Sequence, residues 1–507
     1  MTVQRVLLIT ADQWRGDSLG CVGHKIIKTP NVDGLARDGV LFKRHYTCSV
    51  PCGPSRATML TGMYPTNHRM VTNGTPLNGT LTNIALEMRK GGFDPVLFGY
   101  TDVTPDPRYL PAADPVLRSY EGILPGFTVG QSLTEDNKPW LAALKRLGYE
   151  IKGTGKEIYV PENLNPEGGL SSEPAVYKAE HSDTAWMTDR VIDHIEFCGD
   201  EPFFIHASFI RPHPPFIAPE PYNEMYRNKD IPKPVKASSY EKELEQHPAI
   251  GFFHDDTSLL SFVKGRQNQE LKNLSDEDIH HIRATYYGLI SEVDDQIGRL
   301  IQSLKDKNIY DDTLIILTSD HGEQMGDHYL LGKQTFFEKS FHIPLIIKNV
   351  GNTESGKVVD EFTETIDIMP SILDACGLGI PHQCDGASLM PFLRDEQVKN
   401  WRKEVCALFD FRGVAERKAE TRFDLPSDQC ALMFLRDEKY KYVHFNGLPP
   451  VFYDLEKDPD EQKNLANKEE YAPLILEYAQ KLLSWRMRHE YGALDMMSAT
   501  DEGMYVG

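Results

Sequence analysis

The chain has 507 residues, of which 40% are hydrophobic, 25% charged and 10% aromatic, and these values allow a large buried core. Its formal net charge is −21 without long basic runs, which argues against nucleic acid or a membrane surface as partner, because phosphate binding needs a positive face. The first apolar run, VLLI, is too short for a signal peptide or a membrane span, and eight irregularly spaced cysteines indicate reduced thiols in the cytoplasm.

Five short apolar runs predict buried parallel strands. Each is rich in β-branched or aromatic residues on both faces, as a sheet covered on both sides requires. They are RVLLITAD near 5–12, DPVLFGY at 94–100, PFFIHASFI at 202–210, TLIILTSD at 313–320 and PLIIKN at 344–349.

Between the strands lie helical patterns, and the clearest begins at Ser275. Asp278 stands three residues on, as in a capping box, and apolar residues then recur with a period near 3.6 as far as Leu304. Alternation of strands and helices predicts an α/β layered fold with a mostly parallel sheet between helices.

Two stretches depart from this pattern. Residues 105–175 are rich in Pro, Gly and Asn and predict an excursion over the surface. Within it, Gly153-Thr154-Gly155-Lys156 is not a P-loop, because the first glycine of that motif would fall on Glu150. From about residue 395 the runs ALMFLRDEKYKYVHF and VFYDLEKDP predict antiparallel strands, followed by an amphipathic helix through Trp485. We therefore expect a catalytic α/β domain over 1–394 and a smaller α+β subdomain over 395–507.

Polar residues follow four of the predicted strands. In open α/β sheets, ligands bind beyond the carboxyl ends of the strands, so these ends are where a site is expected. The residues there are Asp12-Gln13, then Gly99-Tyr100-Thr101-Asp102, then Arg211-Pro212-His213, and Asp320-His321-Gly322 with Lys333 beyond.

Asp12, Asp320 and His321 form a candidate metal set, to which Gln13 can add a carbonyl oxygen. Hard oxygen ligands with one imidazole suit Mn²⁺ or a similar divalent ion, whereas an all-oxygen shell would favour Ca²⁺ or Mg²⁺.

The segment SVPCGPSRATMLTG (49–62) places Cys52 at a tightly specified turn. Pro54 suits the first turn of a helix, so Cys52 should lie at a helix N-terminus, where backbone N–H groups attract anions, with Arg56 about one turn in. A buried structural cysteine and a direct thiolate nucleophile are both compatible with this pattern.

Cys52-Gly53-Pro54-Ser55-Arg56, with Leu60-Thr61-Gly62 downstream, resembles the sulfatase signature CxPSRxxxLTG. The resemblance extends over nearly the whole chain to the pattern that runs from Tyr453-Asp454-Leu455 to Asn464-Leu465-Ala466. It implies the alkaline-phosphatase-like α/β fold with a smaller C-terminal subdomain, and oxidation of Cys52 to formylglycine by a separate maturase.

Three positions depart from ordinary sulfatases. Asp12-Gln13 replaces Asp-Asp, Asp320-His321 replaces Asp-Asn, and Tyr100-Thr101-Asp102 replaces Lys-x-His. The first two departures are similar to the arylsulfatase and phosphonate monoester hydrolase subgroup. That subgroup has Thr where Asp102 stands, so a substrate contact by Asp102 follows from its place after the strand at 94–100 and not from the resemblance.

The resemblance implies a hydrolase that uses one divalent metal, Mn²⁺ or alternatively Ca²⁺, with Cys52 as nucleophile precursor and metal ligand. One hydroxyl of the hydrated aldehyde attacks the ester, and the other expels sulfate or phosphonate. The remaining roles fall on residues that would orient the nucleophile, protonate or stabilise the leaving oxygen, or contact the substrate. These are Arg56 for the first role, His213 and Lys333 for the second, and Asn73, Tyr100 and Asp102 for the third.

The positive charges of the metal, Arg56 and Lys333, opposed by Asp12 and Asp320, suit a monoanionic ester, namely a sulfate monoester, a phosphonate monoester or a phosphodiester. A small anionic ester is therefore the expected partner. We also expect a homo-oligomer. The alternatives are a metal-dependent phosphatase or phosphomutase of the same superfamily, catalysis by the Cys52 thiolate itself, and a non-enzymatic binding protein. The first would need a hydroxyl where Cys52 stands, and the last should lack either the metal set or the CxPSR turn.

Overall fold

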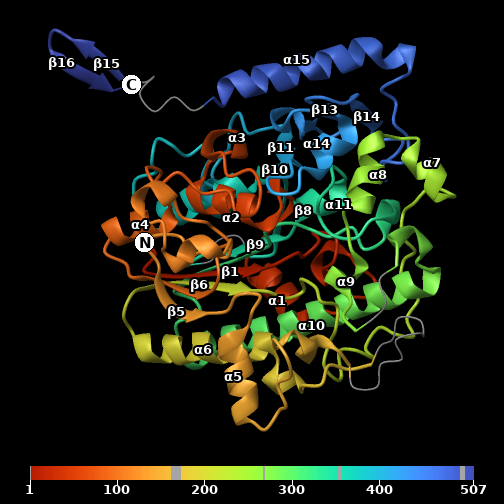
Figure 1. Cartoon of the computed structure of the whole chain (residues 1–507). Coiled ribbons are helices and arrows are strands. Elements are labelled where there is room, and N and C mark those ends of the chain that lie inside the picture. The colour runs from red at the N-terminus through yellow and green to blue at the C-terminus, as the bar shows by residue number, and fades with distance from the viewer. Residues whose placement is uncertain (1, 162–172, 266–268, 352–354, 491–496, 507) are drawn as a thin grey trace.

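All five apolar runs that predicted parallel strands lie in one nine-stranded sheet (Figure 1). The computed structural model describes residues 2–161, 173–265, 269–351, 355–490 and 497–506. The strand order is β10–β2–β9–β7–β1–β6–β4–β5, and β8 pairs with β2. The strands are β1 (Arg5–Ala11), β2 (Val40–Tyr46), β4 (Pro95–Gly99), β5 (Thr128–Ser132), β6 (Phe203–Phe209), β7 (Thr313–Thr318), β8 (His342–Ile343), β9 (Leu345–Lys348) and β10 (Lys357–Glu364).

The predicted direction of one strand is wrong. The run at 344–349 forms β9, which pairs antiparallel with both β7 and β2. The short β8 is also antiparallel to β2, whereas β1, β4, β5, β6 and β7 pair in parallel, as do β2 and β10. The sheet is therefore mixed and mostly parallel. A strand buried on both faces is apolar throughout in either direction, so its sequence does not reveal which way it runs.

Helices cover both faces of this sheet. The side chains of a strand alternate between the two faces, so the apolar side chains on each face pack against a layer of helices. Leu7 and Ile9 of β1 belong to the core shared with α1 (Pro30–Asp38), α6 (Asp183–Cys198) and α10 (Asp276–Asp306). Val6 and Leu8 face the other core. That core contains residues of α2 (Cys52–Thr61), α4 (Ile84–Lys90) and α12 (Ile368–Ala375).

The predicted capping box is present at the start of α10. Ser275 Oγ accepts from Asp278 N at 3.1 Å, and Asp278 Oδ2 accepts from Ser275 N at 3.0 Å. The apolar stripe is buried as expected, from Ile279 to Leu304. The remaining helices are α3 (Pro65–His68), α5 (Lys138–Arg146), α7 (Tyr240–Leu244), α8 (Pro248–Asp255), α9 (Leu259–Phe262), α11 (Glu338–Phe341), α13 (Met390–Leu393), α14 (Lys418–Phe423) and α15 (Ala472–Arg488).

A second, five-stranded sheet has the order β14–β13–β12–β11–β3. It is antiparallel except between β11 and β3. Helix α15 lies against it, with Tyr478, Leu482 and Trp485 buried (Figure 1). The edge strand β3 comes from the N-terminal part and immediately precedes the Cys52 turn, so this sheet helps to position that turn. The strands are β3 (Ser49–Val50), β11 (Val405–Asp410), β12 (Ala431–Arg436), β13 (Tyr440–Phe445) and β14 (Val451–Asp454).

The predicted surface excursion at 105–175 contains more structure than expected, although 162–172 lie outside the described residues. Strand β5 extends the large sheet at its edge, and Trp140 of α5 is fully buried. At the other end of the chain, β15 (Met497–Thr500) and β16 (Gly503–Val506) form a hairpin. Within the described part of the chain, no helix has the length and apolar character needed to span a bilayer.

Candidate active site

The carboxyl ends of the four polar-tipped strands meet at one edge of the sheet, as predicted. The strands β7, β1, β6 and β4 are consecutive neighbours. Residues that follow them therefore lie together: Asp320 after β7, Asp12 after β1, His213 beyond β6, and Tyr100 after β4. The backbone N–H of Asp12 still donates to Phe209 O at 3.0 Å, which fixes Asp12 at the edge of the sheet.

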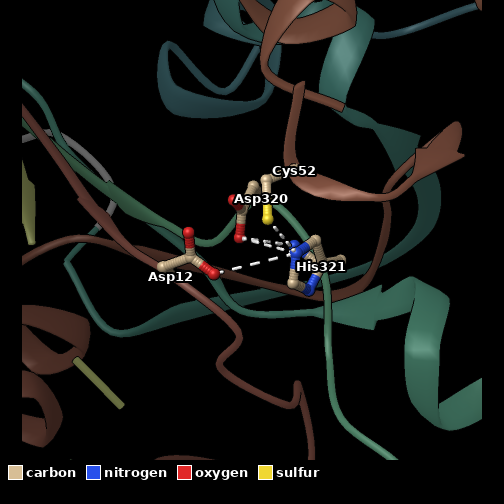
Figure 2. A group of neighbouring side chains, drawn as sticks. All are labelled: Asp12, Cys52, Asp320 and His321. Atoms are coloured by element: carbon tan, nitrogen blue, oxygen red, sulfur yellow. Dashed lines mark hydrogen bonds and ion pairs between the residues drawn. The ribbon is translucent and has the colours of Figure 1, made fainter. Parts of the chain in front are cut away.

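Four side chains converge at this edge: Asp12, Cys52, Asp320 and His321 (Figure 2). One ligand atom of each lies within 4.8 Å of the others, and all four residues are buried. Cys52 Sγ is 3.2 Å from His321 Nε2, and that nitrogen is 3.7 Å from Asp12 Oδ1 and from Asp320 Oδ1. The structure thus brings four of the five predicted metal ligands together.

The donor set fits a divalent cation. Asp12 Oδ1 is buried without a hydrogen-bond partner, which is a costly arrangement unless a cation binds there. His321 donates through Nδ1 to Gly322 O at 3.1 Å, so Nε2 faces the cluster with its lone pair. Burial, followed by the charge of Lys333, lowers the pKa of His321 to about 3 and keeps the imidazole in its neutral, metal-binding form.

Arg56 holds the two carboxylates in place. Its Nε donates to Asp320 Oδ2 at 2.9 Å and its Nη2 to Asp12 Oδ2 at 3.0 Å. Its Nη1 donates to Ser208 Oγ at 2.7 Å, and the guanidinium lies 4.3 Å from the ring centroid of Tyr100. Burial disfavours the Asp12 carboxylate, but the attraction of that carboxylate to protonated His213, in the low pH range where both groups titrate, and to Arg56 outweighs burial and lowers the Asp12 pKa. Arg56 is fully buried, and its two ion-paired nitrogens are engaged by these carboxylates.

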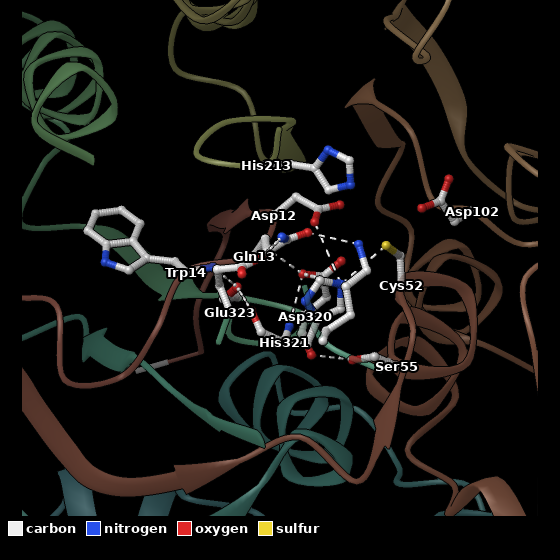
Figure 3. Close-up of polar contacts among 12 residues, drawn as sticks. Asp12, Gln13, Trp14, Cys52, Ser55, Asp102, His213, Asp320, His321 and Glu323 are labelled. Carbon is white, nitrogen blue, oxygen red and sulfur yellow. Dashed lines mark hydrogen bonds and ion pairs between the residues drawn. The ribbon is translucent and has the colours of Figure 1, made fainter. Parts of the chain in front are cut away.

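Gln13 lies between the metal cluster and the open side of the site. Its amide Nε2 donates to Glu323 (Figure 3). Its Oε1 accepts from Lys333 Nζ at 2.8 Å. The backbone N–H of Gln13 donates to Asp320 Oδ1 at 3.1 Å. Since one lone pair of Oε1 remains, the predicted metal-ligand role of Gln13 stays a prediction.

Glu323 was missed by the sequence analysis although it is fully buried in the site. Besides the Gln13 amide it accepts from Met325 N at 3.0 Å and from Gly332 N at 2.5 Å. It therefore fixes both Gln13 and the loop that leads to Lys333. Glu323 lies two residues after His321, in the polar loop DHGEQ, and this proximity to a predicted metal ligand could have identified it as a site residue.

Tyr100 and Asp102 both face the buried side of the site. The Tyr100 hydroxyl donates to Asp12 Oδ2 at 2.7 Å, so it supports a metal-ligating carboxylate. Asp102 has φ +52°, and its buried Oδ1 has no hydrogen-bond partner. Burial raises the pKa of Asp102 despite the nearby charge of Arg56, 3.8 Å away at Nε. Burial therefore disfavours the charged form of Asp102.

The turn at Cys52 is tightly packed. Cys52 is the first residue of α2, and Gly53 N donates to Asn73 Oδ1 at 2.9 Å. A Cβ on Gly53 would lie 2.7 Å from Met70 Cε and 2.8 Å from Asp102 O, so this position requires glycine. Burial, followed by Asp12, raises the pKa of the Cys52 thiol, which disfavours a reactive thiolate.

A cavity of about 450 Å³ opens beside this cluster, lined by Gln13, Asn73, His213 and Lys333. His213 donates through Nδ1 to Pro214 O at 2.7 Å, which leaves Nε2 free. Burial, followed by the charge of Lys333, lowers the pKa of His213 to about 4. Burial opposes the Lys333 charge, but the groups of Cys52 and Asp12 outweigh it and raise the Lys333 pKa. The cavity thus has a neutral imidazole and a cationic lysine at its inner end.

Comparisons with known proteins agree with this geometry. The sulfatase family model matches residues 4–378, and the model of the C-terminal part of N-sulphoglucosamine sulphohydrolase matches residues 326–488. The chain is 41% identical to the multifunctional alkaline phosphatase superfamily protein PehA of Trinickia caryophylli, over 99% of each chain. It is 30% identical to an arylsulfatase of Clostridium perfringens, over 94% of this chain and 93% of the other. The phosphonate monoester hydrolase of Agrobacterium radiobacter has a similar structure, with a TM-score of 0.96, 45% identity and coverage of 99% of each chain.

Proposed function

This chain belongs to the sulfatase family and is a hydrolase, and on that premise we propose that it cleaves sulfate monoesters and phosphonate monoesters, using a formylglycine made from Cys52. Phosphodiesters are a further substrate class within the proposal. The observation that carries it is the position of Cys52 Sγ, inside the candidate metal cluster and 3.2 Å from His321 Nε2.

The side chains of the site divide into three roles. Asp12, Asp320 and His321 would hold one divalent cation with Gln13 and the modified Cys52. That cation would supply a positive charge that favours an ionised nucleophile and offsets the charge of the ester. Lys333 would stabilise or protonate the leaving oxygen, because it is cationic and lines the cavity. Asn73 lines the same cavity and would contact the substrate.

The charges favour a monoanionic ester. The positive groups are the cation, Lys333 and Arg56, and the two carboxylates of Asp12 and Asp320 oppose them. Arg56 is committed to those carboxylates by its hydrogen bonds, so little positive charge remains for a dianionic phosphate monoester. Turnover of phosphate monoesters at the rate of aryl sulfates would contradict this assignment.

The nature of the metal, the location and the partners are further parts of the proposal. We assign Mn²⁺, with Ca²⁺ as the alternative, because an imidazole belongs to the donor set. All eight cysteines, which lie in the described part of the chain, are free thiols, and this supports a reducing compartment such as the cytoplasm. A formylglycine-generating maturase is required for Cys52, and a homo-oligomer is expected.

Mass spectrometry of the tryptic peptide 45–56 tests the proposal, because that peptide also contains Cys48 as an internal unmodified reference. Active protein should have the aldehyde at Cys52 and a thiol at Cys48. Cys52→Ala should abolish turnover, whereas Cys48→Ala should leave the modification at Cys52 in place. An unmodified Cys52 in fully active protein would overturn the proposal in favour of thiolate catalysis. Full activity of Cys52→Ser would favour the phosphatase-type alternative.

A further inference from the structure

The cavity beside the metal cluster is much larger than the reacting group of a sulfate or phosphonate ester requires. Its volume of about 450 Å³ lies in the range of pockets that enclose a whole small-molecule ligand. The inner end holds Gln13, His213 and Lys333, so the rest of the cavity is left for the alcohol half of the ester. The side chains of the outer wall therefore determine which alcohols fit.

Two lysines stand on that outer wall. Lys156 begins the short 3₁₀ helix Lys156–Tyr159, in the segment that the sequence predicted to be a surface excursion, and Lys264 follows α9. Lys264 is half-buried, and its Nζ donates to Leu260 O at 2.8 Å. Both side chains therefore border the space that the alcohol half would occupy.

The charges of the two lysines are not matched by direct ion pairs. Burial and then the positive charge of Lys156 lower the pKa of Lys264, so the two ammonium groups repel each other across the wall. Among the described residues, no carboxylate lies within 4.0 Å of either ammonium. Glu135 also lines the cavity and attracts Lys264 from a greater distance, but it accepts a hydrogen bond from the Tyr120 hydroxyl at 2.7 Å.

This concentration of positive charge is unusual for this chain. With a net charge of −21, its average surface repels anions, yet Lys156, Lys264 and Lys333 line a single cavity. Two other charged groups of the lining, Asp256 and Arg211, are already paired, with Lys418 at 2.8 Å and with Asp183 at 3.0 Å. A local positive wall inside a cavity attracts an anionic ligand more strongly than the same charges on an open surface, because the cavity excludes part of the solvent. Lys333 faces the reacting ester, which leaves the other two lysines for a different anionic group.

We propose that Lys156 and Lys264 bind a second anionic group, such as a carboxylate or a phosphate, on the alcohol half of the ester substrate. This inference rests on the proposed ester hydrolysis and narrows its substrate class. The physiological substrate would then have two separated negative groups, one cleaved at Cys52 and the other held at the outer wall.

The test compares two aryl esters of the same phosphonate, one with a neutral phenyl ring and one with a carboxylate in the meta position. Lys156→Gln, Lys264→Gln and the double variant are assayed with both esters. Lys145→Gln, an exposed lysine of α5 that does not line the cavity, is the matched control. The neutral ester reports on folding and on the chemistry of each variant.

We expect the double variant to raise KM for the carboxylated ester about fivefold to tenfold, with less than a twofold change for the neutral ester. Calorimetric binding of meta-hydroxybenzoate and phenol to Cys52→Ala gives a readout without turnover. The carboxylated phenol should bind more tightly than phenol, and the two lysine substitutions should remove that difference. Equal effects on both esters, no effect on either, or an equal effect of Lys145→Gln would overturn the inference. Absence of wild-type turnover with both esters would contradict the proposed function, while the binding difference would still test the lysine pair.

Discussion

Arg56 Nη2 and Asp12 Oδ2 form an ion pair of 3.0 Å in which neither side chain has appreciable solvent exposure. The same guanidinium holds Asp320 through Nε at 2.9 Å, so one planar fork sets the separation of two candidate metal ligands. Arg56 therefore orients two candidate metal ligands and is not free to bind a substrate. For metal binding, the planar shape of its guanidinium should matter more than its charge.

Substitution of Arg56 by lysine should weaken metal binding. Lysine keeps the charge but cannot place two donors on two carboxylates, so Asp12 and Asp320 should lose their mutual orientation. We expect the affinity for Mn²⁺ to fall about tenfold to hundredfold, measured by calorimetric titration of the metal-free protein.

Arg402→Lys is the matched control, because Arg402 also donates two hydrogen bonds to carboxylate oxygens, through Nη1 and Nη2 to Asp367, outside the metal cluster. It should lower the stability while leaving the Mn²⁺ affinity unchanged. If both substitutions weakened metal binding equally, the orienting role of Arg56 would be wrong.

Glu323→Ala should disturb both Gln13 and Lys333. The substitution leaves the Gln13 amide and the N–H of Gly332 without their buried acceptor. We expect the free energy of unfolding to fall by about 2 kcal/mol or more in urea titrations, and kcat per folded molecule to fall about tenfold.

Glu461→Ala provides the comparison for Glu323, because Glu461 is also buried and accepts from Lys441 Nζ at 2.6 Å and from Glu338 N at 2.7 Å. It should cost comparable stability without changing kcat per folded molecule. A Glu323→Ala protein that is destabilised but retains normal kcat would show that Glu323 has only a structural role.

The sequence was sufficient for features set by local pattern and by strand ends. The apolar runs located β1, β4, β6 and β7, and the strand-end rule placed Asp12, Asp320 and His321 together. It failed where long-range pairing decides. Strand β2 contains the exposed Lys43 and half-buried Arg44, so its run did not read as a buried strand.

Two contacts of the site also depend on packing between distant segments. Glu323 contacts Gln13 across 310 residues of chain, and Arg56 contacts Asp320 across 264 residues. No local pattern encodes such a contact. The same reason explains why the surface excursion could not be recognised as one wall of the cavity, to which Glu135, Lys156 and Tyr159 contribute.

His68 should make the protein less stable in acid. Its Nδ1 accepts from Met70 N at 3.1 Å, and its Nε2 is 3.0 Å from Thr58 Oγ1, which itself donates to Pro54 O. Nδ1 can accept only while it is unprotonated, so this contact requires the neutral ring, with the proton on Nε2. Burial, followed by the charge of Arg69, lowers the pKa of His68 to about 3, from an ordinary value of 6.5.

Because the folded state binds fewer protons at His68 than the unfolded state, this contribution is constant above pH 6.5 and is lost as the pH falls towards 3. It amounts to about 3 kcal/mol between pH 7 and pH 4. In urea titrations, the wild type should lose about 3 kcal/mol more of its unfolding free energy between pH 7 and pH 4 than His68→Gln loses. The exposed His382→Gln should behave as the wild type does. Parallel curves for His68→Gln and the wild type would refute the assignment.

Lys333→Ala should slow esters with poor leaving groups most. His213 donates a hydrogen bond from Nδ1–H to Pro214 O and has a pKa of about 4, so at neutral pH its Nε2 has no proton to donate. Lys333 is cationic and lines the cavity beside Gln13, which makes it the available proton donor for the leaving oxygen. We expect a loss of about 10² in kcat/KM for alkyl esters and a much smaller loss for 4-nitrophenyl esters, whose leaving group needs no proton.

The measurement is the dependence of kcat/KM on the leaving-group pKa, which should become steeper in Lys333→Ala. Lys339→Ala is the control, since Lys339 pairs with Asp17 at 2.8 Å and does not line the cavity. A uniform loss across all leaving groups would instead place Lys333 in the orientation of Gln13, because the hydrogen bond between them would then be its main contribution.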